Sequence, residues 1–168
     1  ENTDGTGLNY KRILKFPQGD TSSLAAADYD GDGLLDLYVC NYLNDSETET
    51  VSLSDSIYNG IDGGMNRLYR NEGKLSFTDQ TEATGMQVEA TRMSLAASWE
   101  DFDNDGDVDL YVANDFGPNC LYRNDKGKFT QIAPDVGADD PSTGMSITWG
   151  DINRDGLMDA CIGNMFSA

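Results

Sequence analysis

The sequence lacks histidine entirely and is poor in basic residues. None of its 168 residues is His, which excludes His-based catalytic triads and His-containing zinc sites within this chain. Only 11 Lys and Arg stand against 30 Asp and Glu, so the formal net charge is −19. A charge of that sign repels nucleic acids and anionic membrane surfaces, and we expect neither as a partner.

Long apolar runs and cysteine pairs are also missing. No stretch approaches the roughly 20 apolar residues of a membrane helix, and no basic, apolar leader stands at the start, so we expect no membrane insertion and a signal peptide that is absent or removed. Cys40, Cys120 and Cys161 are odd in number and form no Cys-x-x-Cys motif. Buried free thiols are the expectation, with one disulfide plus a free thiol as the alternative for an exported protein.

What the sequence does contain is an internal repeat. Three Asp-rich nonapeptides align, namely DYDGDGLLD at 28–36, DFDNDGDVD at 101–109 and DINRDGLMD at 151–159. Each follows a run of small and apolar residues and precedes another apolar run. A second marker, LYRN, occurs at 68–71 and 121–124, and each copy is followed by a Gly-Lys turn and a Phe-Thr step. Two markers that recur in step indicate a repeated structural unit.

The repeat predicts an all-β fold. One unit contains four short strands in about 50 residues, the strand count of a propeller blade, and no 10-residue stretch has helical periodicity. We therefore expect a single propeller fragment over 1–168 with about three four-stranded antiparallel blades, at about 8–42, 66–115 and 119–168. Residues 10–16 would replace outer strands of the first blade, and 44–65 would form a polar insertion loop between blades. Three blades do not close a ring, which predicts a fragment of a larger, for example seven-bladed, propeller or a self-assembling unit.

The Asp-rich loops are candidate calcium sites, because Ca²⁺ prefers six to eight oxygen ligands on flexible loops. Positions 1, 3, 5 and 9 offer side-chain oxygens, and position 7 offers a backbone carbonyl. Position 6 is always Gly, which permits a sharp bend. We expect about three Ca²⁺, with the third site weakest because Asn replaces Asp at its position 3. The predicted ligands are Asp28, Asp30, Asp32, Leu34 and Asp36; Asp101, Asp103, Asp105, Asp107 and Asp109; and Asp151, Asn153, Asp155, Leu157 and Asp159.

Two other kinds of loop share part of this pattern. Asp-Gly is a common hairpin turn, so the loops could merely tolerate acids; their recurrence at three equivalent positions favours calcium. An EF-hand requires Glu at position 12 and flanking helices. Position 12 is Val39, Val112 and Ile162 here, inside strand-like runs. The sequence therefore predicts a calcium loop within a β-hairpin, with the ion in a structural role.

The combined pattern NRLYRN, GKLSFTD and AASWEDFDNDGDVDLYVAND resembles the FG-GAP/VCBS repeat family of integrin-like β-propellers, in the variety of cartilage-acidic-protein-like and ASPIC/UnbV-containing proteins. The resemblance covers roughly 22–164. It implies that Asp28, Asp30, Asp32, Asp36 and their counterparts bind calcium. The Phe-Gly and Gly-Ala-Pro signatures are degenerate here, and no Asp-x-Ser-x-Ser adhesion motif is evident.

These observations predict a non-enzymatic module for extracellular or cell-surface recognition or adhesion. Its partner would be a protein or carbohydrate ligand, with self-association through exposed blade edges as a further expectation. A secreted, periplasmic or cell-surface location follows because calcium loops fill readily where free calcium is high. The alternative is part of a polysaccharide lyase or hydrolase. Trp99 and Trp149 are expected to pack between blades rather than against sugars, and Arg70 and Arg123 to form ion pairs within their blades.

Overall fold

A computed structural model of the chain describes residues 20–43 and 63–165, and these form an all-β structure as predicted. No helix in these two ranges is long and apolar enough to cross a membrane. The predicted strand at 10–16, and most of the predicted insertion at 44–65, lie outside the described residues. The strands are β1 (Thr21–Ala27), β2 (Asp36–Asn41), β3 (Arg67–Asn71), β4 (Phe77–Asp79), β5 (Ser94–Glu100), β6 (Asp109–Asn114), β7 (Cys120–Asp125), β8 (Lys128–Gln131), β9 (Gly144–Gly150) and β10 (Asp159–Asn164).

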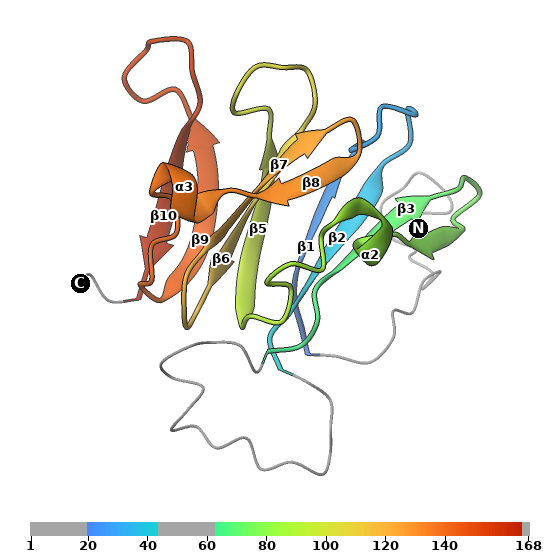
Figure 1. Cartoon of the computed structure of the whole chain (residues 1–168), viewed down its shortest axis with the longest axis horizontal. Helices are drawn as coiled ribbons and strands as arrows, with labels where there is room; N and C mark the ends of the chain where they lie inside the picture. The colour runs from blue at the N-terminus through green and yellow to red at the C-terminus, as the bar shows by residue number, and fades with distance from the viewer. Residues whose placement is uncertain (1–19, 44–62, 166–168) are drawn as a thin grey trace, which may run out of the picture.

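The strands form three antiparallel sheets that stand in series (Figure 1). Two have four strands, in the orders β1-β2-β3-β4 and β5-β6-β7-β8, and the third contains β9 and β10. The first strands pack side by side, β1 on β5 and β5 on β9. Two four-residue helices, α2 (Thr81–Thr84) and α3 (Ala133–Val136), follow β4 and β8. The described strands therefore form blade-like sheets that do not close into a ring.

The sheets group the strands differently from the predicted blades at 8–42, 66–115 and 119–168. Each LYRN strand pairs with the strand before it in the chain, with Leu68 opposite Tyr38 and Leu121 opposite Tyr111. It is therefore the third strand of a sheet and not the first strand of the next. A repeat can be divided at any point of its cycle, and only the hydrogen bonds decide where a sheet begins. The insertion at 44–65 accordingly separates β2 and β3 of one sheet rather than two sheets.

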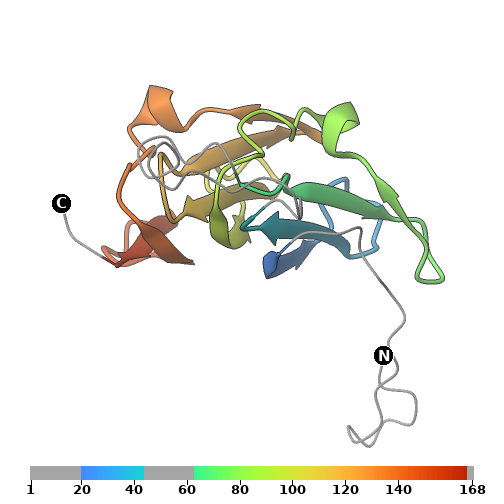
Figure 2. The ribbon, with the colours of Figure 1, turned by 90° about the horizontal axis from the view of Figure 1, so that it is seen from below.

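The core lies between neighbouring sheets, because alternate residues of a strand face opposite sides. In β6, Leu110 and Val112 contribute to the cluster shared with the first sheet, whereas Tyr111 contributes to the cluster facing the third. The first cluster contains Tyr29, Tyr38, Cys40, Leu68, Met86, Leu110, Val112, Cys120, Tyr122 and Phe129. Figure 2 shows the same three sheets side by side from below, with the red β9–β10 hairpin at one end.

Two equivalent aromatic pairs connect successive sheets. Tyr38 meets Trp99 edge to face with ring centroids 6.4 Å apart, and Tyr111 meets Trp149 in the same way at 6.2 Å. Each pair joins the second strand of one sheet to the first strand of the next, so the prediction that both Trp side chains pack between blades is confirmed. All three cysteines are free, and burial raises the pKa of Cys40 and Cys120 to about 12.

Candidate metal centres

The three Asp loops connect β1 to β2, β5 to β6 and β9 to β10, and they project from the same side of the molecule (Figure 1). Position 12 of each loop lies inside a strand, where Val39, Val112 and Ile162 belong to β2, β6 and β10. The prediction of hairpin loops rather than EF-hands is therefore confirmed. The glycines at position 6 have φ of +86°, +98° and +89°, the left-handed region that favours Gly.

The first Asp of each loop organises the turn. Its two carboxylate oxygens accept hydrogen bonds from the backbone N–H groups of positions 5 and 6, which face the interior of the loop. The donor–acceptor distances are 3.0 and 2.8 Å at Asp28, 3.0 and 3.0 Å at Asp101, and 3.0 and 3.0 Å at Asp151. These bonds hold the first carboxylate in the same orientation in all three loops.

The last Asp of the first two loops is buried and connects the loop to the third strand. The Oδ1 atom of Asp36 accepts the N–H of Asn71 at 2.7 Å, and that of Asp109 accepts the N–H of Asn124 at 2.8 Å. Burial raises the pKa of both carboxyls, and that of Asp109 reaches about 6 because the hydrogen bonds offset burial only in part. Asp159 in the third loop accepts the N–H of Ile152 at 2.9 Å, but β10 pairs with no third strand in the described ranges.

Positions 1, 3 and 9 converge in the first two loops. One oxygen from each of Asp28, Asp30 and Asp36 lies within 4.8 Å of the others, and the same holds for Asp101, Asp103 and Asp109. Oxygens bound to one Ca²⁺ at about 2.4 Å are separated by no more than about 4.8 Å, so either group could hold a metal ion. In the third loop Asn153 replaces the carboxylate at position 3, and no group of three acids forms there among the described residues.

The remaining predicted ligands are not in these two groups. The position 5 side chains Asp32, Asp105 and Asp155 each accept the N–H of position 7 at 2.9 Å, so one of their oxygens is engaged with the backbone. The backbone carbonyls of Leu34, Asp107 and Leu157 remain predicted ligands. The structure therefore brings together three of the five predicted positions in each of the first two loops.

One participant in the first loop was not expected there. Arg70, from the LYRN strand β3, donates from Nε to Asp30 and from Nη2 to Asp32, both at 2.5 Å, and from Nη1 to Glu72 at 2.9 Å. The predicted ion pairing of Arg70 is confirmed, but its partners in the loop could not be read from sequence because β3 is remote in the chain. Arg123, its counterpart in β7, forms no ion pair among the described residues.

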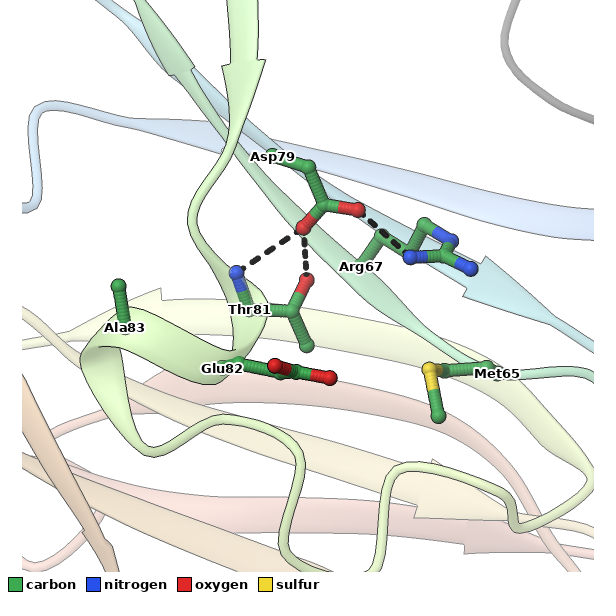
Figure 3. A pocket seen from close by; sticks show the side chains of 6 residues that line it. All are labelled: Met65, Arg67, Asp79, Thr81, Glu82 and Ala83. Carbon is green, nitrogen blue, oxygen red and sulfur yellow. Dashed lines mark hydrogen bonds and ion pairs between the residues drawn. The ribbon is translucent and has the colours of Figure 1, made fainter.

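A separate open pocket of about 520 Å³ lies beside β3, β4 and α2 (Figure 3). Asp79 in its wall accepts hydrogen bonds from Thr81 and pairs with Arg67 at 2.6 Å. Burial raises the pKa of Asp79, but these contacts outweigh it, and the net pKa is lower than usual. A carboxyl of that kind stays ionised at neutral pH and is unsuited to act as a general acid. The other lining residues are Met65, Glu82 and Ala83.

Successive four-stranded antiparallel sheets, each with the same Asp loop between its first two strands, define a repeat protein built from propeller blades. Comparison with known families agrees: the FG-GAP-like repeat matches residues 101–162 and the FG-GAP repeat matches 21–53. The chain belongs to the FG-GAP repeat family and is a module of integrin-like propeller repeats. It is also 28% identical over 145 residues to Cartilage acidic protein 1 of Xenopus tropicalis, covering 84% of this chain and 21% of that protein.

Proposed function

We propose that this chain is a calcium-binding propeller module for extracellular or cell-surface recognition or adhesion, in which Ca²⁺ has a structural role. The observation that carries the proposal is the convergence of three carboxylates in each of two equivalent hairpin loops. The name of the relative, Cartilage acidic protein 1, supports an extracellular setting. Free calcium is high in that setting, so loops of modest affinity would fill.

The donor set fits calcium better than a softer metal. Every converging ligand is a carboxylate oxygen, the chain contains no His, and Cys40 and Cys120 are buried in the core. Hard oxygen donors on a flexible loop suit Ca²⁺, whereas zinc and copper prefer nitrogen and sulfur. The raised pKa of Asp36 and Asp109 shows that their negative charge is costly without a counter-ion. A bound cation would offset that cost.

The proposed role is structural because the same carboxylates already connect two parts of each sheet. Asp36 joins the β1–β2 loop to β3 through the N–H of Asn71, and Asp109 joins the β5–β6 loop to β7 through that of Asn124. An ion at positions 1, 3 and 9 would fix the loop against the third strand. We propose a third, weaker ion at Asp151, Asp155 and Asp159, with Asn153 supplying a neutral oxygen.

A non-catalytic role is consistent with the placement of the perturbed acids. Asp36 and Asp109 have raised pKa values, but both oxygens of each accept backbone N–H groups. Buried carboxyls whose oxygens already accept backbone N–H groups are poorly placed to transfer a proton to a sugar substrate. The carboxyl in the pocket wall, Asp79, has a lowered pKa. No observation favours the polysaccharide lyase or hydrolase that the sequence left as an alternative.

We also propose that a strand of the pattern Asn-x-Leu-Tyr-Arg-Asn pairs with the outer edge of β10. Every residue of β6 is buried, whereas no residue of β10 is, because no third strand covers it in the described ranges. In the two larger sheets the equivalent edge receives a strand of the pattern Asn-x-Leu-Tyr-Arg-Asn, at 66–71 and 119–124. A strand with that pattern would add to β10 in the same register.

A synthetic peptide with the sequence of residues 119–131 tests the edge proposal. The expected result is saturable binding that shifts the amide resonances of β10, with a scrambled peptide as the control. Predicted self-association through the same edge would be reversed by the peptide in a sizing experiment. Equal shifts with both peptides would refute the assignment.

Calorimetric titration with CaCl₂ and thermal unfolding in CaCl₂ or EGTA test the calcium proposal. We expect two stronger sites, a third weaker one, and a melting temperature that rises with calcium. MgCl₂ serves as the control, because Mg²⁺ gives up its hydration water reluctantly. Absence of binding heat together with identical melting curves in CaCl₂ and EGTA would overturn the proposal.

A further inference from the structure

The guanidinium of Arg70 contacts the first candidate metal centre. It reaches two loop carboxylates, with Nε 2.5 Å from an oxygen of Asp30 and Nη2 2.5 Å from an oxygen of Asp32. Asp30 is one of the three acids that converge in this loop. The same side chain that would bind a cation at position 3 is therefore already paired with a cationic group of the protein.

The second loop provides an internal comparison. Arg123 occupies the same place in its LYRN motif, one residue before the Asn whose N–H contacts the last Asp of the loop. It forms no ion pair among the described residues, and Asp103 is left without a basic partner there. The residue two positions further on differs as well: Glu72 accepts a hydrogen bond from Arg70 at 2.9 Å, whereas its counterpart is the shorter Asp125. The two loops therefore differ in the basic and acidic groups beside them.

The formal charges of the two loops also favour cation binding at the second loop. The acids of the first loop are Asp28, Asp30, Asp32 and Asp36, and Arg70 reduces their total from −4 to −3. The second loop carries five acids, for a total of −5, with no paired arginine: Asp101, Asp103, Asp105, Asp107 and Asp109. A divalent cation is attracted more strongly by the second loop, and at the first it must also displace the guanidinium.

We propose, building on the calcium-binding function above, that Arg70 is a tethered competitor for the cation at the first loop. The second loop therefore fills at lower Ca²⁺ concentration than the first, and Ca²⁺ binding at the first loop releases Arg70 from Asp30 and Asp32. The two centres then respond to different ranges of free calcium. Without calcium, Arg70 serves as the counter-ion that holds the first loop together.

The amides of Gly33 and Gly106 allow the two loops to be followed separately. Each donates to the first Asp of its own loop, at 2.8 and 3.0 Å, so each reports the occupancy of one site. We would titrate the ¹⁵N-labelled full chain with CaCl₂ for the wild type, Arg70→Gln and the matched control Arg123→Gln. Arg70→Gln removes both ion pairs with the loop, so the Gly33 transition is expected to move to a severalfold lower Ca²⁺ concentration. The Gly106 transition is expected to be unchanged.

Two more measurements separate competition from a general structural role. Arg70→Lys keeps the charge but not the fork that contacts both carboxylates, and we expect an intermediate Gly33 transition. In EGTA, Arg70→Gln is expected to melt below the wild type, and in saturating CaCl₂ the difference should disappear. Arg123→Gln should leave the Gly33 transition where it is in the wild type.

The outcomes distinguish this inference from the calcium proposal on which it rests. Absence of any Ca²⁺ response at both Gly33 and Gly106 refutes calcium binding itself. A normal response at both amides, with the Gly33 transition of Arg70→Gln equal to or weaker than that of the wild type, refutes the competition and leaves calcium binding intact. A melting difference that persists in saturating CaCl₂ also refutes it.

Discussion

Asp109→Asn is the substitution that best distinguishes the stability gained from bound Ca²⁺ from the stability of the fold itself. Asp109 is fully buried, and its two oxygens accept the N–H groups of Phe102 at 3.1 Å and Asn124 at 2.8 Å. Asn has the same shape, but its side chain offers one acceptor and one donor group. One of the two backbone N–H groups therefore loses its partner, while a buried negative charge is removed.

The two effects nearly cancel when calcium is absent. A pKa raised from 3.8 to about 6 corresponds to about 3 kcal/mol that opposes the ionised carboxylate at pH 7. Leaving one buried N–H unsatisfied costs about 1–3 kcal/mol. We therefore expect Asp109→Asn to change the free energy of unfolding in EGTA by no more than about 2 kcal/mol. With calcium at about 100 times the dissociation constant, the wild type gains about 2.7 kcal/mol from the second site, and the variant lacks this gain.

Urea unfolding in EGTA and in CaCl₂ provides the test, with the exposed Asp125→Asn as the control in the same sheet. Because the folded-state pKa of Asp109 is raised, its contribution to stability is largest below pH 4 and is lost as the pH rises through about 6. In EGTA the wild type should lose about 1 kcal/mol relative to Asp109→Asn between pH 5 and 7. An equal loss of stability in EGTA and CaCl₂ would show that Asp109 is structural only and would refute the reasoning.

Two further predictions concern the third loop and the contact between sheets. The Gly156 amide, which donates to Asp151 at 3.0 Å, reports on the third loop. Asn153→Asp places a carboxylate at position 3, and we expect the Ca²⁺ transition of this amide to move to lower concentration; an unchanged transition would show that this position is not a ligand. Asn124→Ala removes a buried hydrogen bond from Nδ2 to the carbonyl oxygen of Tyr29 at 2.9 Å and a partly buried one to that of Val108 at 3.0 Å. We expect a loss of about 2 kcal/mol in chemical unfolding, whereas Asn71→Ala, whose single such bond is exposed, should lose less than half of that; equal losses would contradict the assignment.

The sequence predicted the elements of the fold well because the repeat is regular. The three Asp loops fall between paired strands, and Tyr38 with Trp99 repeats as Tyr111 with Trp149, as equivalent positions in a repeat require. Which strands pair within one sheet was harder to predict from the sequence. The LYRN motif does not indicate whether β3 pairs with the preceding strand β2 or with the following strand β5. The pairing depends on hydrogen bonds between residues far apart in the chain.

The candidate site was predicted as a set of ligands but not as an arrangement. Spacing alone placed positions 1, 3, 5 and 9 in one loop, but it treated them as equivalent. The structure distinguishes them: Asp109 is buried and held by two N–H groups, whereas Asp105 turns one oxygen to the backbone. Arg70 enters the first loop from another strand, 38 residues beyond Asp32. Such a contact depends on the pairing of β2 with β3, so no local pattern could reveal it.

A crystal structure grown in CaCl₂, with anomalous scattering to locate the ions, tests the central claim most directly. The account predicts an ion within about 2.6 Å of oxygens from Asp28, Asp30 and Asp36, and another bound in the same way by Asp101, Asp103 and Asp109, with Arg70 turned away from Asp30. Water alone at both places in saturating calcium, with Arg70 still paired to Asp30, would contradict it.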